Sequence, residues 1–291
     1  IREMCLDYFR LVDGFIGKIV DSVGPDARLF FASDHGFGPS DRIFYVNTWL
    51  AENGYLTWKE SVPLADEDRL SGEGPRSHTM LFDWSRTRAC ALTARSNGIY
   101  IRSTDGEALS DSEYRPFRQE LKQGLEAIPD PVTGDPLLRH VWTRDEAFPG
   151  SCSDRAPDLT LMLRDHGFVS VLRSDAAVKV RSRIVGTHKP NGVFMATGPG
   201  IRQGQSLDET LSIMDVAPSL LYSVGLPLPA DFEGELPLKV FDEAQLKASP
   251  PQAGPATQHP RAIREAQGAS ELSEEDEEMI FERLKALGYM E

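Results

Sequence analysis

The sequence is poor in cysteine, has no long apolar run and carries few basic residues for its number of acidic ones. Its three cysteines, Cys5, Cys90 and Cys152, form neither a disulfide framework nor a CxxC zinc motif, so we expect small apolar fillers. No apolar run approaches the ~20 residues that a membrane-spanning helix needs. The net charge of −14 argues against nucleic acid as the main partner, because binding a duplex requires a basic face.

The chain begins inside a helical pattern. Gly24-Pro25 ends this predicted helix, and its apolar face consists of Met4, Tyr8, Leu11, Val12, Phe15, Ile19 and Val20. No capping residue precedes Ile1, so the helix resembles one that has been cut. We therefore expect the sequence to be the C-terminal part of a longer protein. The sequence predicts neither a cellular compartment nor an oligomeric state.

The end of the chain differs in composition from the rest. Residues 248–270 are rich in Pro, Ala, Gln and Gly, which is typical of a linker. Residues 271–291 predict a final helix with Ser273 as the N-cap, acidic residues in its first turn and Gly288 at its end. The preceding residues 1–247 are expected to be the C-terminal portion of one catalytic domain.

A helix followed by a buried strand indicates an α/β fold. Residues 27–33 form a continuous apolar run, which is typical of a parallel strand that is covered on both faces. We therefore expect a mostly parallel sheet sandwiched by helices. A second strand is predicted at Gly192–Thr197. A helix that runs to Val224, with Asp215 as its capping residue, is predicted to end at Gly225.

The middle of the chain predicts a mixture of helices and strands. The expected elements are a helix over 43–55 that Asn53-Gly54 closes, a polar loop over 60–76, strands over 98–101, 138–142 and 158–163, and a helix over 112–128. Residues of about 60–170 therefore form either an inserted α+β cap or an extension of the sheet.

Asp34 and His35 follow the first predicted strand, where the chain turns through Gly36. The carboxyl edge of an open α/β sheet is where sites form, and zinc accepts both carboxylate oxygen and neutral imidazole. The alternative is an Asp-His hydrogen bond within a turn.

The tetrapeptide Asp-His-Gly-Phe occurs twice, at Asp34–Phe37 and again at Asp165–Phe168. Both copies follow apolar runs, so local spacing does not decide which of them binds metal. His188, in a Gly-Thr-His-Lys-Pro-Asn-Gly loop, is a further candidate ligand, with a plain surface histidine as the alternative. Lys189 beside it either neutralises a substrate phosphate or is simply solvated.

Several longer motifs, in this order along the chain, carry a resemblance to a known family. They are Ser33-Asp-His-Gly-Phe-Gly-Pro39, Val46–Leu56, Asp83–Ala89, Asn97-Gly-Ile-Tyr100, Asp130–Gly134, Ala156-Pro-Asp-Leu159, Gly186-Thr-His188, Gly192-Val-Phe194, Gly198–Ile201, Met214–Ser219 and Arg283–Tyr289. Together they resemble the alkaline phosphatase superfamily, in the branch akin to type I phosphodiesterases and nucleotide pyrophosphatases. Within it, Asp83–Ala89 and Asn97–Tyr100 look like the superfamily's predicted phosphohydrolases or phosphomutases.

This resemblance implies a parallel sheet between helices and a site with two divalent metals. Asp34 and His35 would bind one metal and His188 the other, while His166 would lie elsewhere and bind none. Mixed Asp and His ligands favour zinc, with manganese as the alternative. The family's hydroxyl nucleophile, its first Asp ligand and its Asp-x-x-x-His pair would lie upstream of residue 1, so these residues alone are expected to be inactive.

The resulting hypothesis is a metal-dependent hydrolase of phosphate mono- or diesters with a small-molecule substrate. The upstream hydroxyl would attack phosphorus in line, and water would then release the phosphoryl group from the enzyme. Alternatives within the superfamily are a phosphomutase or a sulfatase. A non-catalytic binding or scaffold module that kept three metal ligands is the alternative from another class.

Overall fold

A computed structural model describes residues 2–60, 64, 78–93, 96–104, 109–150 and 152–257 of the chain. Within them the chain forms two compact units, which we describe separately: unit 1 comprises residues 2–36 and 190–257, and unit 2 comprises residues 37–189. Most of the predicted polar loop over 60–76, the predicted linker beyond residue 257 and the predicted final helix over 271–291 lie outside the described residues.

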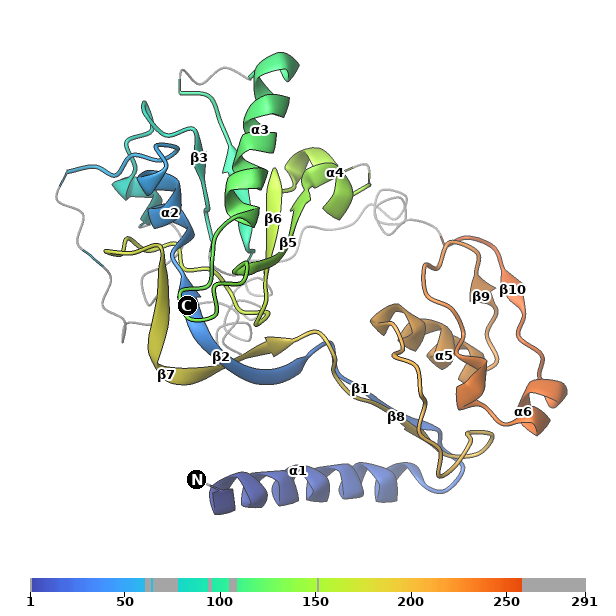
Figure 1. Ribbon diagram of the computed structural model, residues 1–291. Helices are drawn as coiled ribbons and strands as arrows, with labels where there is room; N and C mark the ends of the chain where they lie inside the picture. The colour runs from blue at the N-terminus through green and yellow to red at the C-terminus, as the bar shows by residue number, and fades with distance from the viewer. Residues whose placement is uncertain are drawn as a thin grey trace, which may run out of the picture. The chain divides into compact units, whose positions relative to one another are not determined.

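Unit 1 opens with helix α1 (Arg2–Val23), which ends where Gly24 takes a φ of +79°, as the sequence predicts (Figure 1). No residue of α1 is buried, and its apolar face is exposed. Among the helices that the structure describes, none is long and apolar enough to cross a bilayer.

Strand β1 (Leu29–Ala32) pairs with β8 (Phe194–Thr197), with Leu29 opposite Thr197. Both strands were predicted, but they pair antiparallel and form a two-stranded sheet, and β1 is only partly buried. The prediction of a mostly parallel sheet is therefore not confirmed, because the sheets of the described residues are small and mostly antiparallel. A continuous apolar run carries no information on strand direction.

The rest of unit 1 surrounds a small core made by Ile201, Tyr222, Val240 and Phe241. The predicted helix is present as α5 (Val216–Ser223), followed by Gly225 with a φ of +76°. The Asp215 side chain does not cap α5, because its carboxylate accepts from the backbone N–H groups of Ser212 and Glu235. The remaining elements are η3 (Ile213–Asp215), β9 (Leu228–Pro229), η4 (Leu238–Val240), α6 (Glu243–Ala248) and β10 (Ala253–Gly254), which pairs parallel with β9.

Unit 2 contains a pair of long strands, β2 (Gly36–Phe44) and β7 (Val178–Lys189). Neither strand was predicted. Helix α2 (Val46–Glu52) begins three residues later than the expected Ile43, since Ile43 and Phe44 belong to β2. The end of α2 agrees with the prediction: Asn53 is its C-cap and Gly54 has a φ of +77°.

A four-stranded antiparallel sheet, in the order β3-β4-β6-β5, forms the centre of unit 2. Its strands are β3 (Ala89–Cys90), β4 (Gly98–Ile101), β6 (Leu159–Leu163) and β5 (Leu138–Thr143). Helix α3 (Asp111–Glu126) lies along it, in contact with β5 (Figure 1). The short helices η1 (His78–Leu81), α4 (Arg144–Ala147) and η2 (Ser153–Arg155) complete the unit.

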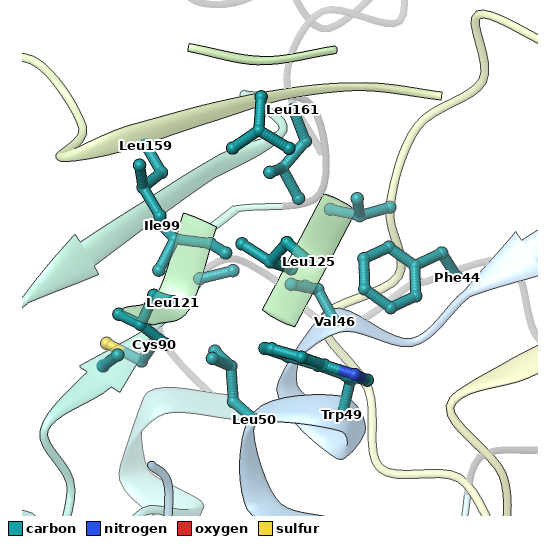
Figure 2. Packing of buried hydrophobic residues seen from close by; sticks show 14 of the residues in the cluster. Phe44, Val46, Trp49, Leu50, Cys90, Ile99, Leu121, Leu125, Leu159 and Leu161 are labelled. Atoms are coloured by element: carbon teal, nitrogen blue, oxygen red, sulfur yellow. The ribbon is translucent and has the colours of Figure 1, made fainter. Parts of the chain in front are cut away.

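The main core joins α2, α3 and this sheet. Figure 2 shows Trp49 and Leu50 from α2 and Leu121 and Leu125 from α3 gathered around Ile99 of β4. Side chains three or four residues apart lie on one face of a helix, which explains how each helix presents a single apolar stripe to the sheet.

The cysteines differ from one another in burial. Cys90 is the apolar filler that the sequence predicts, and burial raises the pKa of its thiol to about 12. Cys5 and Cys152 are exposed, so that prediction is wrong for them.

Candidate functional site

Asp34 and His35 lie in the turn between β1 and β2, at the end of the apolar strand. The Asp34 side chain is 77% exposed and that of His35 36% exposed. The two side chains point toward each other, with His35 Nε2 and Asp34 Oδ1 at 3.5 Å. The turn therefore presents a carboxylate and an imidazole together at the surface of unit 1.

The backbone fixes the orientation of the His35 ring. Nδ1 lies 2.9 Å from the carbonyl oxygen of Gly36. A carbonyl oxygen only accepts, so Nδ1 carries a proton, and the ring is turned with Nε2 toward Asp34. Metal-binding histidines are commonly oriented in this way by a backbone carbonyl.

The spacing of the pair suits one metal ion. Ligands at about 2.0–2.2 Å from a tetrahedral zinc ion lie roughly 3.3–3.6 Å from each other. The Asp34–His35 separation of 3.5 Å falls within this range. These two residues thus fit a zinc ion by donor type, by ring orientation and by spacing.

His188 lies in unit 2 and is part of strand β7, so its predicted placement in a loop is wrong. Its imidazole is flanked by two aromatic rings: Phe168 in an edge contact at 5.4 Å between centroids and Phe37 at 6.2 Å. Phe37 lies across β7 at Gly186, where a Cβ would approach the ring to 2.1 Å. A glycine is therefore required at position 186 for Phe37 to reach His188.

The second Asp-His-Gly-Phe copy forms a structural corner of unit 2. Asp165 accepts a hydrogen bond from Ser40 Oγ at 2.6 Å, which joins its loop to β2, and another from the Gly167 N–H of its own loop at 2.8 Å. Lys189 donates to the Pro39 carbonyl at 2.9 Å and also to the Asp165 carbonyl. Lys189 is thus neither simply solvated nor directed at a phosphate, because it fastens β7 to β2 and to this corner.

His166 differs from His35 in its surroundings. It adopts a φ of +60°, and its Nε2 lies 3.4 Å from the Arg139 guanidinium. Burial, together with the positive charges of Arg139 and Lys189, lowers the pKa of His166. A cation beside the ring disfavours a metal there. Phe168 of this copy contacts the His188 ring, whereas the prediction that His166 lies away from the metals stays a prediction.

Asp34 and His35 belong to unit 1 and His188 to unit 2, so each ligand group is described by itself. Across the described ranges, no three or more His, Cys, Asp and Glu side chains gather in a metal-binding arrangement. The two-metal site formed by Asp34, His35 and His188 therefore stays a prediction.

A cavity of about 620 Å³ lies beside Asp34 within unit 1. One part of its wall is the chain from Pro190 to Ala196, which leads into β8, and another is the segment 205–213. Arg202, Glu209 and Lys239 contribute the charged side chains besides Asp34. Sequence reasoning did not find this cavity, because its residues have no recognisable spacing and meet only in the folded unit.

A family model described as type I phosphodiesterase / nucleotide pyrophosphatase matches residues 3–191, which is more than half of the chain and includes Asp34, His35 and His188. The chain belongs to this family, and the predicted relationship to this branch of the alkaline phosphatase superfamily is confirmed. The family indicates a hydrolase of the phosphodiesterase or pyrophosphatase type. No curated protein and no solved structure matches the chain.

Proposed function

We propose that the protein is a metal-dependent hydrolase of phosphate mono- or diesters, with a small-molecule ester as its substrate. The observation that carries the proposal is the Asp34–His35 pair, whose 3.5 Å separation and ring orientation suit one ion within the matched family region. Asp34 and His35 would hold one divalent metal and His188 would hold the second.

The metals, zinc or alternatively manganese, would supply charge neutralisation for the phosphoryl oxygens. The residues of this chain would hold the metals and orient the metal-binding side chains. The Gly36 carbonyl keeps a proton on His35 Nδ1, and Phe37 and Phe168 contact the exposed His188 ring from two sides and limit its rotation. The nucleophilic hydroxyl would come from a part of the protein that precedes residue 1.

The alkaline phosphatase-like parallel sheet is part of the same proposal. Within the described residues β1 pairs only with β8, so its other edge is available to a further strand. Residues 1–247 would then complete one catalytic domain, with about 60–170 as a cap or insert, followed by a linker over 248–270 and a helix over 271–291.

Removal of metal tests the proposal. The full-length protein is expected to hydrolyse nitrophenyl phosphate or bis(nitrophenyl) phosphate, and chelation should reduce kcat/KM by a factor of about 1000, since metals contribute several kcal/mol to such transition states. Zinc or manganese should restore the rate. Elemental analysis of the same samples provides the control for depletion.

Unchanged turnover in a protein shown to be free of metal would contradict the proposal. Transfer of phosphate within a substrate, without release, would indicate the phosphomutase, and cleavage of a nitrophenyl sulfate in preference to the phosphate would indicate the sulfatase. Stoichiometric metal binding without turnover of any ester would indicate the non-catalytic module.

A further inference from the structure

The charged groups of the cavity beside Asp34 are not equivalent. Lys239 Nζ and Glu209 Oε2 form an ion pair at 2.9 Å, and both side chains are largely exposed. This pair neutralises itself, so it adds little net charge to the cavity. Asp34 is committed to the metal by the proposed function. Arg202 is then the cationic group that remains for a ligand.

Arg202 is held firmly in position. Its backbone N–H donates to the Val240 carbonyl at 2.9 Å, and its Nε donates to the Phe241 carbonyl, also at 2.9 Å. Phe241 is fully buried in the core of unit 1. The terminal nitrogens of Arg202 make no hydrogen bond to any residue that the structure describes. A guanidinium anchored through Nε offers those nitrogens as a fork, which matches the two oxygens of a phosphate or carboxylate.

The rest of the cavity lining suits a polar ligand. Asn191, Gln205, Thr210 and Ser212 supply hydrogen-bonding side chains. Arg202, Lys239 and the segment 205–213 all lie beyond residue 191, where the family match ends. Apart from Ala32–Asp34, Pro190 and Asn191, the cavity wall thus lies outside the region that the family model matches.

We propose that Arg202 is a specificity-determining residue that binds a second oxyanion, a phosphate or a carboxylate, on the part of the substrate that is not hydrolysed. The inference rests on the proposed function, because it takes the reacting phosphate to lie at the metal held by Asp34 and His35. The cavity then receives the remainder of the ester, with its second negative charge at the Arg202 fork.

The test uses matched substrates and the full-length protein with its metals. Butanediol bisphosphate and the phosphate ester of hydroxybutyrate carry a second phosphate or a carboxylate, and butyl phosphate carries neither. Arg202→Met is expected to lower kcat/KM for the substrate with the second anion by about 10- to 100-fold, as loss of a charge-assisted hydrogen bond predicts, and to leave butyl phosphate unchanged. Whichever of the two substrates, the bisphosphate or the carboxylate-bearing ester, shows the larger decrease in kcat/KM identifies the oxyanion that Arg202 binds.

Two further variants separate binding from folding. Arg202→Lys keeps the charge but loses the fork and should fall between the wild type and Arg202→Met. Lys247→Met removes an exposed cation of α6, outside the cavity lining, and should change none of the rates. Equal losses on all three esters, or no loss on any, would overturn the inference while leaving the hydrolase intact. Absence of wild-type turnover on these three esters and also on nitrophenyl phosphate and bis(nitrophenyl) phosphate would overturn the proposed function itself.

Discussion

Replacing His188 with Asn in the full-length protein is expected to reduce hydrolysis of nitrophenyl phosphate by about 1000-fold or more, because one metal of the pair loses a ligand. Asparagine keeps a polar side chain of similar reach but lacks the imidazole nitrogen. Phe37 and Phe168, which flank the ring, do not supply a replacement donor. The measurement is kcat/KM, together with the zinc content per protein molecule, which should fall in parallel.

The duplicated tetrapeptide provides a matched control. His166→Asn makes the same substitution at the second copy, where asparagine tolerates the φ of +60°. This variant should keep wild-type turnover and zinc content, because His166 faces Arg139 and is not assigned to a metal. Wild-type activity in His188→Asn, or an equal loss in both variants, would refute the assignment of His188.

The second large effect concerns stability and a buried carboxylate of unit 2. Asp158, which precedes β6, accepts three hydrogen bonds of 2.6 Å: from the Tyr114 hydroxyl, the Arg144 guanidinium and the Ile101 N–H. Its side chain is 4% exposed, and that of Arg144 is 24% exposed. Burial and the bond to Asp158 raise the pKa of Tyr114, which keeps its hydroxyl proton in place as a donor.

Asp158→Ala is expected to lower the free energy of unfolding by about 3–5 kcal/mol, because it leaves the Arg144 charge without its partner in a mostly buried position. The Arg144 Nε is already buried without an acceptor among the described residues. The guanidinium therefore has few other acceptors that could replace the Asp158 carboxylate. All four tryptophans, Trp49, Trp58, Trp84 and Trp142, lie in unit 2, so urea unfolding followed by tryptophan fluorescence reports on this unit.

Tyr114→Phe is the graded control for this network. It removes one hydrogen bond and no charge, so a loss of only about 1 kcal/mol is expected. A loss below about 1 kcal/mol in Asp158→Ala itself would show that the ion pair and its hydrogen bonds do not stabilise unit 2 in the way proposed.

Elements with strong local signals were predicted well from the sequence. The strand at Gly98–Ile101 has the predicted bounds, and the helix expected over 112–128 is present as Asp111–Glu126. The end of α1 at Gly24 was also predicted, since a left-handed glycine stops a helix by local conformation alone. These features depend on residues that are close together in the sequence, so a local sequence pattern is enough to predict them.

Features that depend on distant partners were missed. The alternation of Val178, Val180 and Ile184 with Lys and Arg is typical of a strand and could have indicated β7, whereas a loop was predicted for its last residues, from Gly186. The direction of β1 depends on β8, which follows more than 160 residues later. The two tetrapeptides were indistinguishable by spacing, whereas the structure shows Asp165 bonded to Ser40 and Asp34 exposed beside His35.

The most direct measurement is the crystal structure of the full-length protein loaded with zinc, with the ions located by anomalous scattering. We expect two ions about 4 Å apart, as in two-metal phosphoryl-transfer sites. Asp34 Oδ1 and His35 Nε2 should both bind the first ion and His188 the second. Zinc bound at His166 and Asp165, or His188 remote from an ion held by Asp34, would contradict the account.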